Sequence, residues 1–296
     1  MDYLSVKETS KRWKVSERMV RLYCTENRVP KAEYRDGNWY IPSNARKPKR
    51  EVMQKSALQG LAKKVAYQKE RNNHFGIYEY IQVNLAYSSC RMASNRLTRE
   101  QVLDIYRTGR VSVAFEPMKV DDLIEVNNHF WTIRYIAENI GNPLTQTMIK
   151  KIHTMLCYGT EADRAGGVRC GEYRQRHGKF GVSPTVISQE LRALIEEYET
   201  HKSVNLDTIL DFHVRLEKIH PFDDYNGRVG RVIMMKECLR FEIDPFIIDD
   251  KRRGVYNKGI MQWEIDPAVL RAPVLEAQAR FRKQLELCKL MQYCRP

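Results

Sequence analysis

The chain has 296 residues and a mass of 34.9 kDa, which is enough for about two domains. Hydrophobic residues make up 43% and charged residues 29% of the composition, which predicts a buried core and excludes a wholly disordered chain. No stretch approaches the roughly 20 apolar residues of a membrane-spanning helix, and the charged N-terminus lacks the apolar run of a signal peptide. We therefore expect a cytoplasmic protein with no membrane partner.

The net charge of +13 is concentrated near the N-terminus, where residues 1–72 hold 18 Lys and Arg against 8 Asp and Glu. A basic end on a nearly neutral body indicates a module that binds a polyanion, nucleic acid first, whereas the simpler alternative is a solvated basic surface. The seven cysteines show no paired close spacing. This pattern argues against a disulfide framework or a zinc site and predicts reduced thiols.

The first 50 residues predict two short helices followed by a hairpin. One helix covers about residues 5–13, and a second begins after Ser16, whose hydroxyl is a good N-cap. An extended aromatic segment follows at residues 34–41, where Asp36 and Gly37 supply the positive φ angles of a tight turn. This order of elements resembles the winged helix-turn-helix of the MerR and excisionase families.

The resemblance implies that residues 1–50 form a DNA-binding domain. The second helix then enters the major groove, and Arg35 and the basic run at residues 46–50 touch phosphates. The arginines assigned to DNA binding are Arg18, Arg21 and Arg35. The alternative is a small domain that kept this fold to bind protein or to dimerise.

Residues 51–74 are expected to form a linker that passes into a helix, and the rest of the chain is mainly α-helical. Thr98 and Gln101 have the spacing of a capping box, which predicts a helix start. Residues 166–182 alternate around glycines and predict a β-hairpin. The C-terminal helix, in residues 266–296, either packs on the body or mediates a homodimer. Further helices are expected at about 120–139, 145–157, 186–200, 205–219, 227–240 and 251–262, and the C-terminal helix itself at about 267–292.

Residues 220–231, the signature segment, contain most of the side chains that could bind a ligand or take part in a reaction. Pro221 ends the preceding helix, and a second helix begins after Gly227. The loop between them therefore lies at a helix N-terminus, where free backbone N–H groups attract anions. Arg228 and Arg231 are three residues apart, so both project from the same side of the first turn. This arrangement predicts a cradle for a polyphosphate.

Two further residues of the signature segment supply the reactive groups. Asp224 is suited to hold Mg²⁺ that bridges phosphate oxygens. His220 carries an imidazole that can accept a proton near neutral pH. Each residue alone has an ordinary structural explanation, but together they indicate attack of a hydroxyl on a nucleoside triphosphate.

The signature segment resembles the motif of the Fic family, His-Pro-Phe-x-(Asp/Glu)-Gly-Asn-Gly-Arg-x-x-Arg. The resemblance covers residues 75–265 and implies a Fic-type helical bundle with a β-hairpin flap, at residues 166–182, over the active site. It also implies transfer of AMP, with ATP and Mg²⁺, to a Ser, Thr or Tyr hydroxyl of a target protein or of the chain itself. The matching residues are His220, Pro221, Phe222, Asp224, Asn226, Gly227, Arg228 and Arg231.

By this resemblance, His220 is the general base and Asp224 the Mg²⁺ ligand. Asn226 and the Gly227 backbone hold the α-phosphate. The β- and γ-phosphates are held by Arg228 and Arg231. The remaining nucleotide-binding positions are Phe222 and Gly230 in the segment, and Tyr256 and Asn257 where the family lines its nucleoside pocket.

The chain departs from the family pattern within the signature segment, where Tyr225 stands at the usual glycine. If this position needs positive φ, a tyrosine costs about 1–3 kcal/mol of strain or blocks part of the pocket. Weaker activity or a shifted nucleotide preference is then expected, unless the loop relaxes around the ring.

A second departure lies in a segment that resembles the family's inhibitory motif, (Ser/Thr)-x-x-x-Glu-(Gly/Asn)-Asn. Ser89 and Asn95 match this motif, but Ala93 stands where the glutamate belongs. In the family, that glutamate pairs with the second arginine of the motif, here Arg231. Since alanine cannot form this ion pair, we expect a derepressed enzyme.

Two other functions stay open. One is that of a transcriptional regulator whose Fic domain binds nucleotide but does not transfer it, with Tyr225 as the disabling residue. In the other, catalysis is retained but the transferred group is UMP or phosphate.

Overall fold

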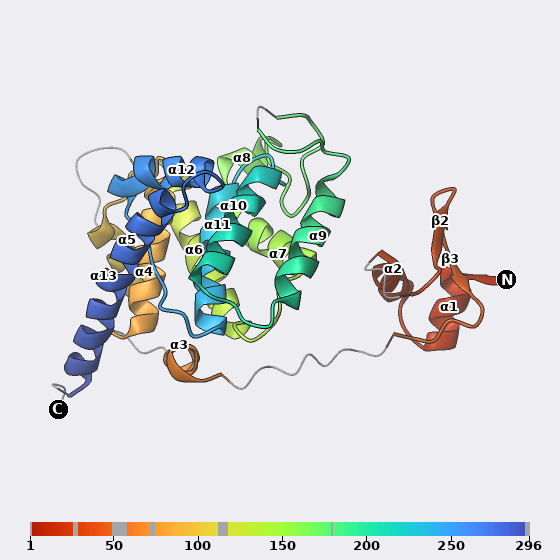
Figure 1. Ribbon diagram of the computed structural model, residues 1–296, viewed down its shortest axis with the longest axis horizontal. Helices are drawn as coiled ribbons and strands as arrows, with labels where there is room; N and C mark the ends of the chain where they lie inside the picture. Colours follow the sequence, from red (N-terminus) through yellow and green to blue (C-terminus); the bar gives the residue numbers. More distant parts are fainter. Residues whose placement is uncertain are drawn as a thin grey trace. The chain divides into compact units, whose positions relative to one another are not determined.

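The computed structural model describes residues 2–25, 29–48, 58–71, 75–111, 118–178 and 180–293. Two compact units are present, Met1–Gln54 and Lys55–Pro296. The first combines two helices with a three-stranded sheet, and the second consists of helices and loops in its described residues (Figure 1). Over these same ranges, no helix is long and apolar enough to cross a membrane.

The N-terminal unit comprises β1 (Tyr3–Ser5), α1 (Val6–Trp13), α2 (Glu17–Thr25), β2 (Glu33–Arg35) and β3 (Asn38–Pro42). The strands pair antiparallel in the order β1-β3-β2. Ser5 begins α1 with a capping box to Glu8. Asp36 and Gly37, with φ of 50° and 77°, form the two-residue turn of the β2–β3 hairpin. Both expected helices and the hairpin turn are therefore present, while residues 49 and 50 of the basic run lie outside the described residues.

The second unit begins with α3 (Gly60–Glu70), α4 (Ile77–Arg91), α5 (Arg99–Thr108), α6 (Val120–Glu138), α7 (Gln146–Cys157) and α8 (Glu161–Arg164). It continues with α9 (Ile187–Thr200), α10 (Leu206–Ile219), α11 (Asn226–Arg240), the 3₁₀ turn η1 (Asp250–Arg252), α12 (Arg253–Gln262) and α13 (Ala268–Tyr293). The helices predicted from residue 120 onward are confirmed to within a few residues. The capping box of Thr98 and Gln101 is also confirmed, at the start of α5.

Helix α11 lies at the centre of this bundle. It packs against α4, α6, α7 and α10, and twelve of its fifteen residues are buried. Because α11 begins with the signature segment, the N-terminal end of the most enclosed helix presents the candidate site. Burial of this helix fixes the position of its first turn.

The last helix, α13, packs on the bundle. Leu270 and Val274 join an apolar cluster with Tyr256 and Trp263, and Phe281 meets Tyr80 edge to face. Of the two alternatives expected for this helix, the structure therefore shows packing on the body.

The β-hairpin flap predicted at residues 166–182 is wrong for the described residues of this segment, where the chain forms an irregular loop between α8 and α9 (Figure 1). The loop directs backbone N–H groups to the signature segment and the end of α10, instead of to a partner strand. The N–H of Arg174 donates to the Pro221 carbonyl (3.0 Å), and that of Val182 to the Ile219 carbonyl (3.3 Å). The segment whose glycine spacing resembled a hairpin is thus a loop that is hydrogen-bonded to the candidate site.

Two cysteines lie together although their spacing in the sequence does not predict it. The Sγ atoms of Cys157, at the end of α7, and Cys170, in the loop after α8, are in contact. The fold brings them together although thirteen residues separate them, a spacing that carries no sequence signature. Four further cysteines are free and buried: Cys24, Cys90, Cys238 and Cys288.

Candidate active site

The signature segment turns sharply between α10 and α11. His220 ends α10 in the left-handed conformation (φ 51°), and Tyr225 begins α11 in the same conformation (φ 67°). Between them, the side-chain amide of Asn226 closes the loop: its Oδ1 accepts from the Phe222 N–H (3.0 Å), and its Nδ2 donates to the Phe222 carbonyl (2.9 Å). Asn226 therefore shapes the loop with both of its polar atoms.

Phe222 and His153 anchor this loop to the bundle. The Phe222 side chain is buried and stacks on the imidazole of His153 in α7, with ring centroids 3.8 Å apart. The Gly171 N–H donates to His153 Nδ1 (2.9 Å), so the imidazole proton is on Nε2, which donates to the Asp224 carbonyl (3.3 Å). Burial lowers the pKa of His153 to about 4, which keeps the ring neutral. His153 has no signal in the sequence and was not predicted.

His220 is half-buried beside the loop that precedes α9. The Arg174 guanidinium donates to the His220 carbonyl (2.7 Å) and also to the carbonyls of Arg176 and Val182. Burial, and after it the positive charge of Arg174, lower the pKa of His220. The imidazole is therefore neutral at pH 7 and able to accept a proton.

Gly181 sets the distance between this loop and His220. It lies at φ 94°, and a Cβ added there would come within 2.7 Å of the His220 Cβ and 2.8 Å of the Ile219 carbonyl oxygen. Only glycine allows both the conformation and the approach. The loop consequently packs directly against the Cβ of His220.

The first turn of α11 has backbone N–H groups that can bind an anion. In the described residues no side chain caps it, and the first helical N–H to reach back is that of Val229, which donates to the Tyr225 carbonyl (2.9 Å). Helix geometry leaves the N–H groups of residues 226–228 without such partners. They point toward the loop, where a negative group is favoured.

Asp224 is the exposed carboxylate of the site, with 59% of its side chain accessible. Its Oδ1 accepts from the Tyr225 N–H (2.5 Å). No cluster of three ligating side chains occurs in the described ranges, so a metal here would have at most two such ligands from the protein. This donor set fits Mg²⁺, which usually binds through one or two carboxylates together with phosphate oxygens and water.

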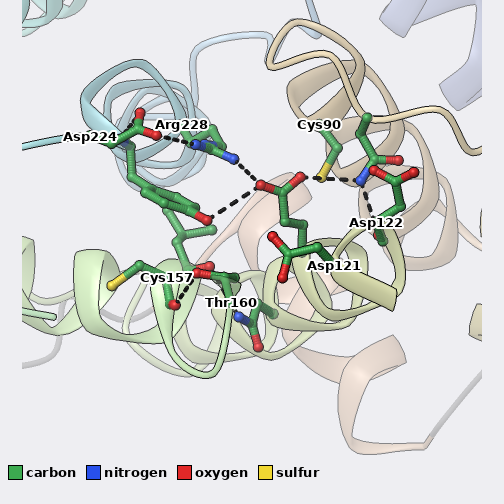
Figure 2. Close-up of polar contacts among 12 residues, drawn as sticks. Cys90, Asp121, Asp122, Cys157, Thr160, Asp224 and Arg228 are labelled. Atoms are coloured by element: carbon green, nitrogen blue, oxygen red, sulfur yellow. Dashed lines mark hydrogen bonds and ion pairs between the residues drawn. The ribbon is translucent and has the colours of Figure 1, made fainter. Parts of the chain in front are cut away.

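Arg228 lies almost fully buried behind Asp224. Its Nη2 donates to Asp224 Oδ2 (3.3 Å; Figure 2), and its Nη1 donates to the carboxylate of Glu125 (2.6 Å). The guanidinium carbon lies 3.4 Å from the centroid of the Tyr225 ring. The first signature arginine is therefore held by two carboxylates and an aromatic face. Glu125, on α6, was not predicted, since nothing in its local sequence marks it.

Arg231 contacts the residues that resemble the inhibitory motif. Its Nε donates to Ser89 Oγ (3.1 Å) and its Nη2 to the Ser89 carbonyl (3.3 Å), at the end of α4. No carboxylate in the described part of the chain lies within ion-pair distance of it, but the buried carboxylate of Glu217 is near enough to interact with its charge. Ala93 is exposed in the turn after α4, whereas Asn95 is buried and donates to Glu125 Oε2 (3.2 Å). Ser89 and Arg231 are among the residues that line a small cavity of about 10 Å³.

The remaining predicted nucleotide-binding residues are partly structural. Gly230 packs against His213, because a Cβ there would lie 2.4 Å from His213 Nδ1. Tyr256 is buried and its hydroxyl bonds to His213 Nε2 (2.5 Å). Asn257 is exposed on α12. Contacts of Tyr256 and Asn257 with a nucleoside stay a prediction.

In the N-terminal unit, two of the three arginines assigned to DNA binding form ion pairs. Arg21 pairs with Glu17 (2.9 Å) on α2, and Arg35 pairs with Glu33 on β2. Arg18 forms no ion pair within the described residues and is exposed on α2. The hairpin and α2 border a cleft of about 420 Å³ that is lined by Arg21, Tyr34 and Trp39 among others.

Comparison with known proteins finds a family match that includes the signature segment. Residues 143–238 match the model of the Fic/DOC family. The chain is 24% identical over 179 residues to "Protein adenylyltransferase Fic" of Drosophila willistoni; this match covers 57% of the chain and 34% of the relative. The chain thus spans about a third of the length of that relative.

Three solved structures share the fold. A Fic-domain-containing signalling protein of Bacteroides thetaiotaomicron has a TM-score of 0.61 and 16% identity, over 77% of this chain and 95% of that one. Residues 134–508 of Fic-1 from C. elegans have a TM-score of 0.58 and 16% identity, over 76% and 70%. A Fic family protein from Desulfovibrio desulfuricans has a TM-score of 0.54 and 19% identity, over 79% and 74%.

Proposed function

We propose that this chain, which carries a domain of the Fic/DOC family, is a protein adenylyltransferase. It would transfer AMP from MgATP to a Ser, Thr or Tyr hydroxyl of a target protein or of itself. One observation carries the proposal: a neutral imidazole, an exposed carboxylate and an uncapped helix N-terminus meet in the loop formed by residues 220–226. A base, a metal ligand and an anion site are the groups that hydroxyl attack on a triphosphate requires.

In the proposed reaction, the target hydroxyl attacks the α-phosphorus of ATP. The new bond joins the hydroxyl oxygen to phosphorus, the bond to the pyrophosphate oxygen breaks, and the hydroxyl proton passes to His220. The lowered pKa of His220 keeps this residue unprotonated before the attack. Pyrophosphate leaves as an anion beside the first turn of α11 and Arg231.

Asp224 would hold Mg²⁺, whose charge when bound offsets that of the phosphate oxygens. The backbone N–H groups of residues 226–228 would donate to the phosphates. Asn226 contributes by fixing the loop, since its amide already bonds to Phe222. Arg231 forms no ion pair in the described ranges, although the buried carboxylate of Glu217 interacts with its charge. It would take the terminal phosphate, which supports the proposal that the enzyme is derepressed.

Intact-mass measurement after incubation with MgATP tests this function. We expect a mass increase of one AMP on the chain or on an added protein target, and loss of that increase in a His220→Ala variant. His201→Ala, on the exposed end of α9, is the matched control and should retain it. ATP labelled in the α- or the γ-phosphate separates AMP transfer from phosphate transfer, and UTP tests transfer of UMP. Nucleotide binding without any transfer would favour the regulatory alternative.

We also propose that the N-terminal unit binds DNA. The order of α1, α2 and the β2–β3 hairpin, together with the basic charge of residues 1–72, supports this second function. Affinity for duplex DNA should fall steeply with salt and weaken in Arg18→Ala. Glu17→Gln should strengthen binding, because it releases Arg21 from its ion pair. Equal binding by a chain that lacks residues 1–54 would contradict the proposal.

A further inference from the structure

We infer that Glu125 is a positioning residue for the transfer reaction: it anchors the inner edge of the Arg228 guanidinium so that the outer edge faces Asp224. This inference rests on the proposed adenylyltransferase function. Glu125 lies on α6, 103 residues before Arg228 in the chain, and belongs to none of the motifs identified in the sequence.

Both carboxylate oxygens of Glu125 have defined partners. Oε1 accepts from Arg228 Nη1 at 2.6 Å and from the Tyr225 hydroxyl at 3.3 Å. Oε2 accepts from Asn95 Nδ2 at 3.2 Å, and the same Nδ2 donates to the Asp122 carbonyl at 3.0 Å. The carboxylate is therefore fixed in orientation from two sides, which is what an anchor for another side chain requires.

Burial makes the anchor necessary. Only 6% of the Arg228 side chain and 13% of the Glu125 side chain are accessible. A guanidinium enclosed to this extent without a counter-charge is strongly destabilising, so loss of Glu125 would drive Arg228 to another position. Asp224 cannot replace Glu125 as the anchor, because its side chain is largely exposed and lies on the opposite edge of the guanidinium.

The two edges of the guanidinium thus face different surroundings. Nη1 donates to Glu125, which is buried. Nη2 donates to the exposed Asp224 (Figure 2). A phosphate that approaches Asp224 can meet Nη2 while Nη1 remains on Glu125. In this arrangement a phosphate can replace Asp224 at Nη2, while the contact between Nη1 and Glu125 is retained.

Tyr225 completes the same support. The centroid of its ring lies 3.4 Å from the guanidinium carbon of Arg228, and its hydroxyl shares Oε1 of Glu125 with Arg228. The side chain that departs from the family glycine is therefore part of the anchor. This contact gives a physical reason for a tyrosine at a left-handed position of the loop.

The experiment compares Glu125→Gln and Glu125→Asp with the wild type in AMP transfer and in NMR spectra of [¹⁵N]arginine-labelled protein. We expect Glu125→Gln to lower kcat by about 10- to 100-fold, the range typical for outer partners of reactive groups. Glu125→Asp, which keeps the charge, should restore part of kcat. The Arg228 guanidinium resonance should be protected from exchange in the wild type and should lose protection in Glu125→Gln.

The control variant is Glu79→Gln. Glu79 is a buried carboxylate that forms an ion pair with the half-buried Arg107 (2.6 Å), made by α4 and α5 outside the signature segment. It should lower the melting temperature without lowering kcat of the folded enzyme. In an Arg228→Ala background, Glu125→Gln should reduce kcat by less than about twofold further, because both changes remove one function.

Three outcomes would overturn the inference: losses from Glu125→Gln and Arg228→Ala that multiply, a Glu125→Gln enzyme as active as the wild type or more active, or an Arg228 resonance that Glu125→Gln leaves protected. A higher activity would mean that Glu125 competes with phosphate for Arg228. If the wild type transfers no AMP, the proposed function fails, and the Arg228 resonance alone still decides whether Glu125 holds the guanidinium.

Discussion

The imidazole of His153 stacks on the ring of Phe222, with centroids 3.8 Å apart and planes 9° from parallel. The same imidazole accepts from the Gly171 N–H and donates to the Asp224 carbonyl. One buried side chain of α7 thus joins the loop after α8 to the signature segment. Its hydrogen bonds require the neutral ring, which makes the local structure sensitive to acid.

We predict that stability falls as the pH drops below about 6.5. The pKa of His153 is lowered by burial to about 4, so the unfolded chain binds a proton more readily than the folded chain over this range. The contribution is fully present above the unfolded pKa and is lost as the pH falls toward 4, in total about 3 kcal/mol from this residue. Burial lowers the pKa of His129 and of His213 to about 3, which adds to the effect.

Denaturant unfolding at a series of pH values measures this dependence. His153→Gln should be less stable at pH 7 but should show a shallower loss between pH 6.5 and pH 4. His201→Gln, at an exposed position, controls for removal of an imidazole. An equal pH slope in His153→Gln and the wild type would show that His153 is not the acid-sensitive group.

The rate of AMP transfer should fall at acidic pH, because protonation of His220 removes the general base. The part of the pH–rate profile in which this occurs is called the acid limb. Burial and the charge of Arg174 lower the pKa of His220, so the unprotonated base is already dominant at pH 7. The single-turnover rate is expected to rise with pH and to level off below about 6.5, the usual pKa of a histidine. Arg174→Met should shift the limb to higher pH. A limb centred above 7 in the wild type would contradict this assignment.

Tyr225→Gly should destabilise the protein by about 2 kcal/mol or more. Glycine removes the strain of a left-handed tyrosine, about 1–3 kcal/mol. However, the Tyr225 side chain is only 3% exposed, and burial of its ring contributes about 4 kcal/mol at about 25 cal/mol per Å². The lost burial therefore outweighs the relief of strain. Denaturant unfolding tests this, and a more stable Tyr225→Gly variant would show that strain dominates.

Ala93→Glu should reduce AMP transfer by about tenfold, which corresponds to about 1.4 kcal/mol of competition for Arg231. Ala93 is exposed in the turn after α4, so the substitution itself should change stability by less than about 0.5 kcal/mol. Ala93→Gln has the same side-chain length without the charge and is the matched control. Initial rates from intact-mass spectra measure the effect; equal rates in the wild type and Ala93→Glu would end the derepression hypothesis.

Local sequence patterns predicted the helices and the loop of the site well. The end of α10 follows from Pro221, and the start of α5 follows from the capping side chain of Thr98, because caps and prolines act within a few residues. The left-handed angle at Tyr225 also follows from the glycine that the family has there. These features depend on backbone geometry that neighbouring residues determine.

Contacts between distant segments could not be predicted in this way. Glu125 meets Arg228 across 103 residues, and His153 meets Asp224 across 71. The hairpin predicted at residues 166–182 failed for the same reason, since Arg174 bonds to Pro221 and Val182 to the end of α10. A local pattern indicates which conformation a segment prefers. It does not indicate which distant backbone groups form hydrogen bonds with that segment in place of a partner strand.

Arg174 shows how a cation can shape the candidate site through backbone contacts alone. Its guanidinium donates hydrogen bonds to three backbone carbonyl oxygens, those of His220, Arg176 and Val182. These donors therefore hold the local backbone in place. A lysine carries the same charge on a single nitrogen and would lack the planar fork that spans these acceptors. At this position, the shape of the cation matters more than its sign.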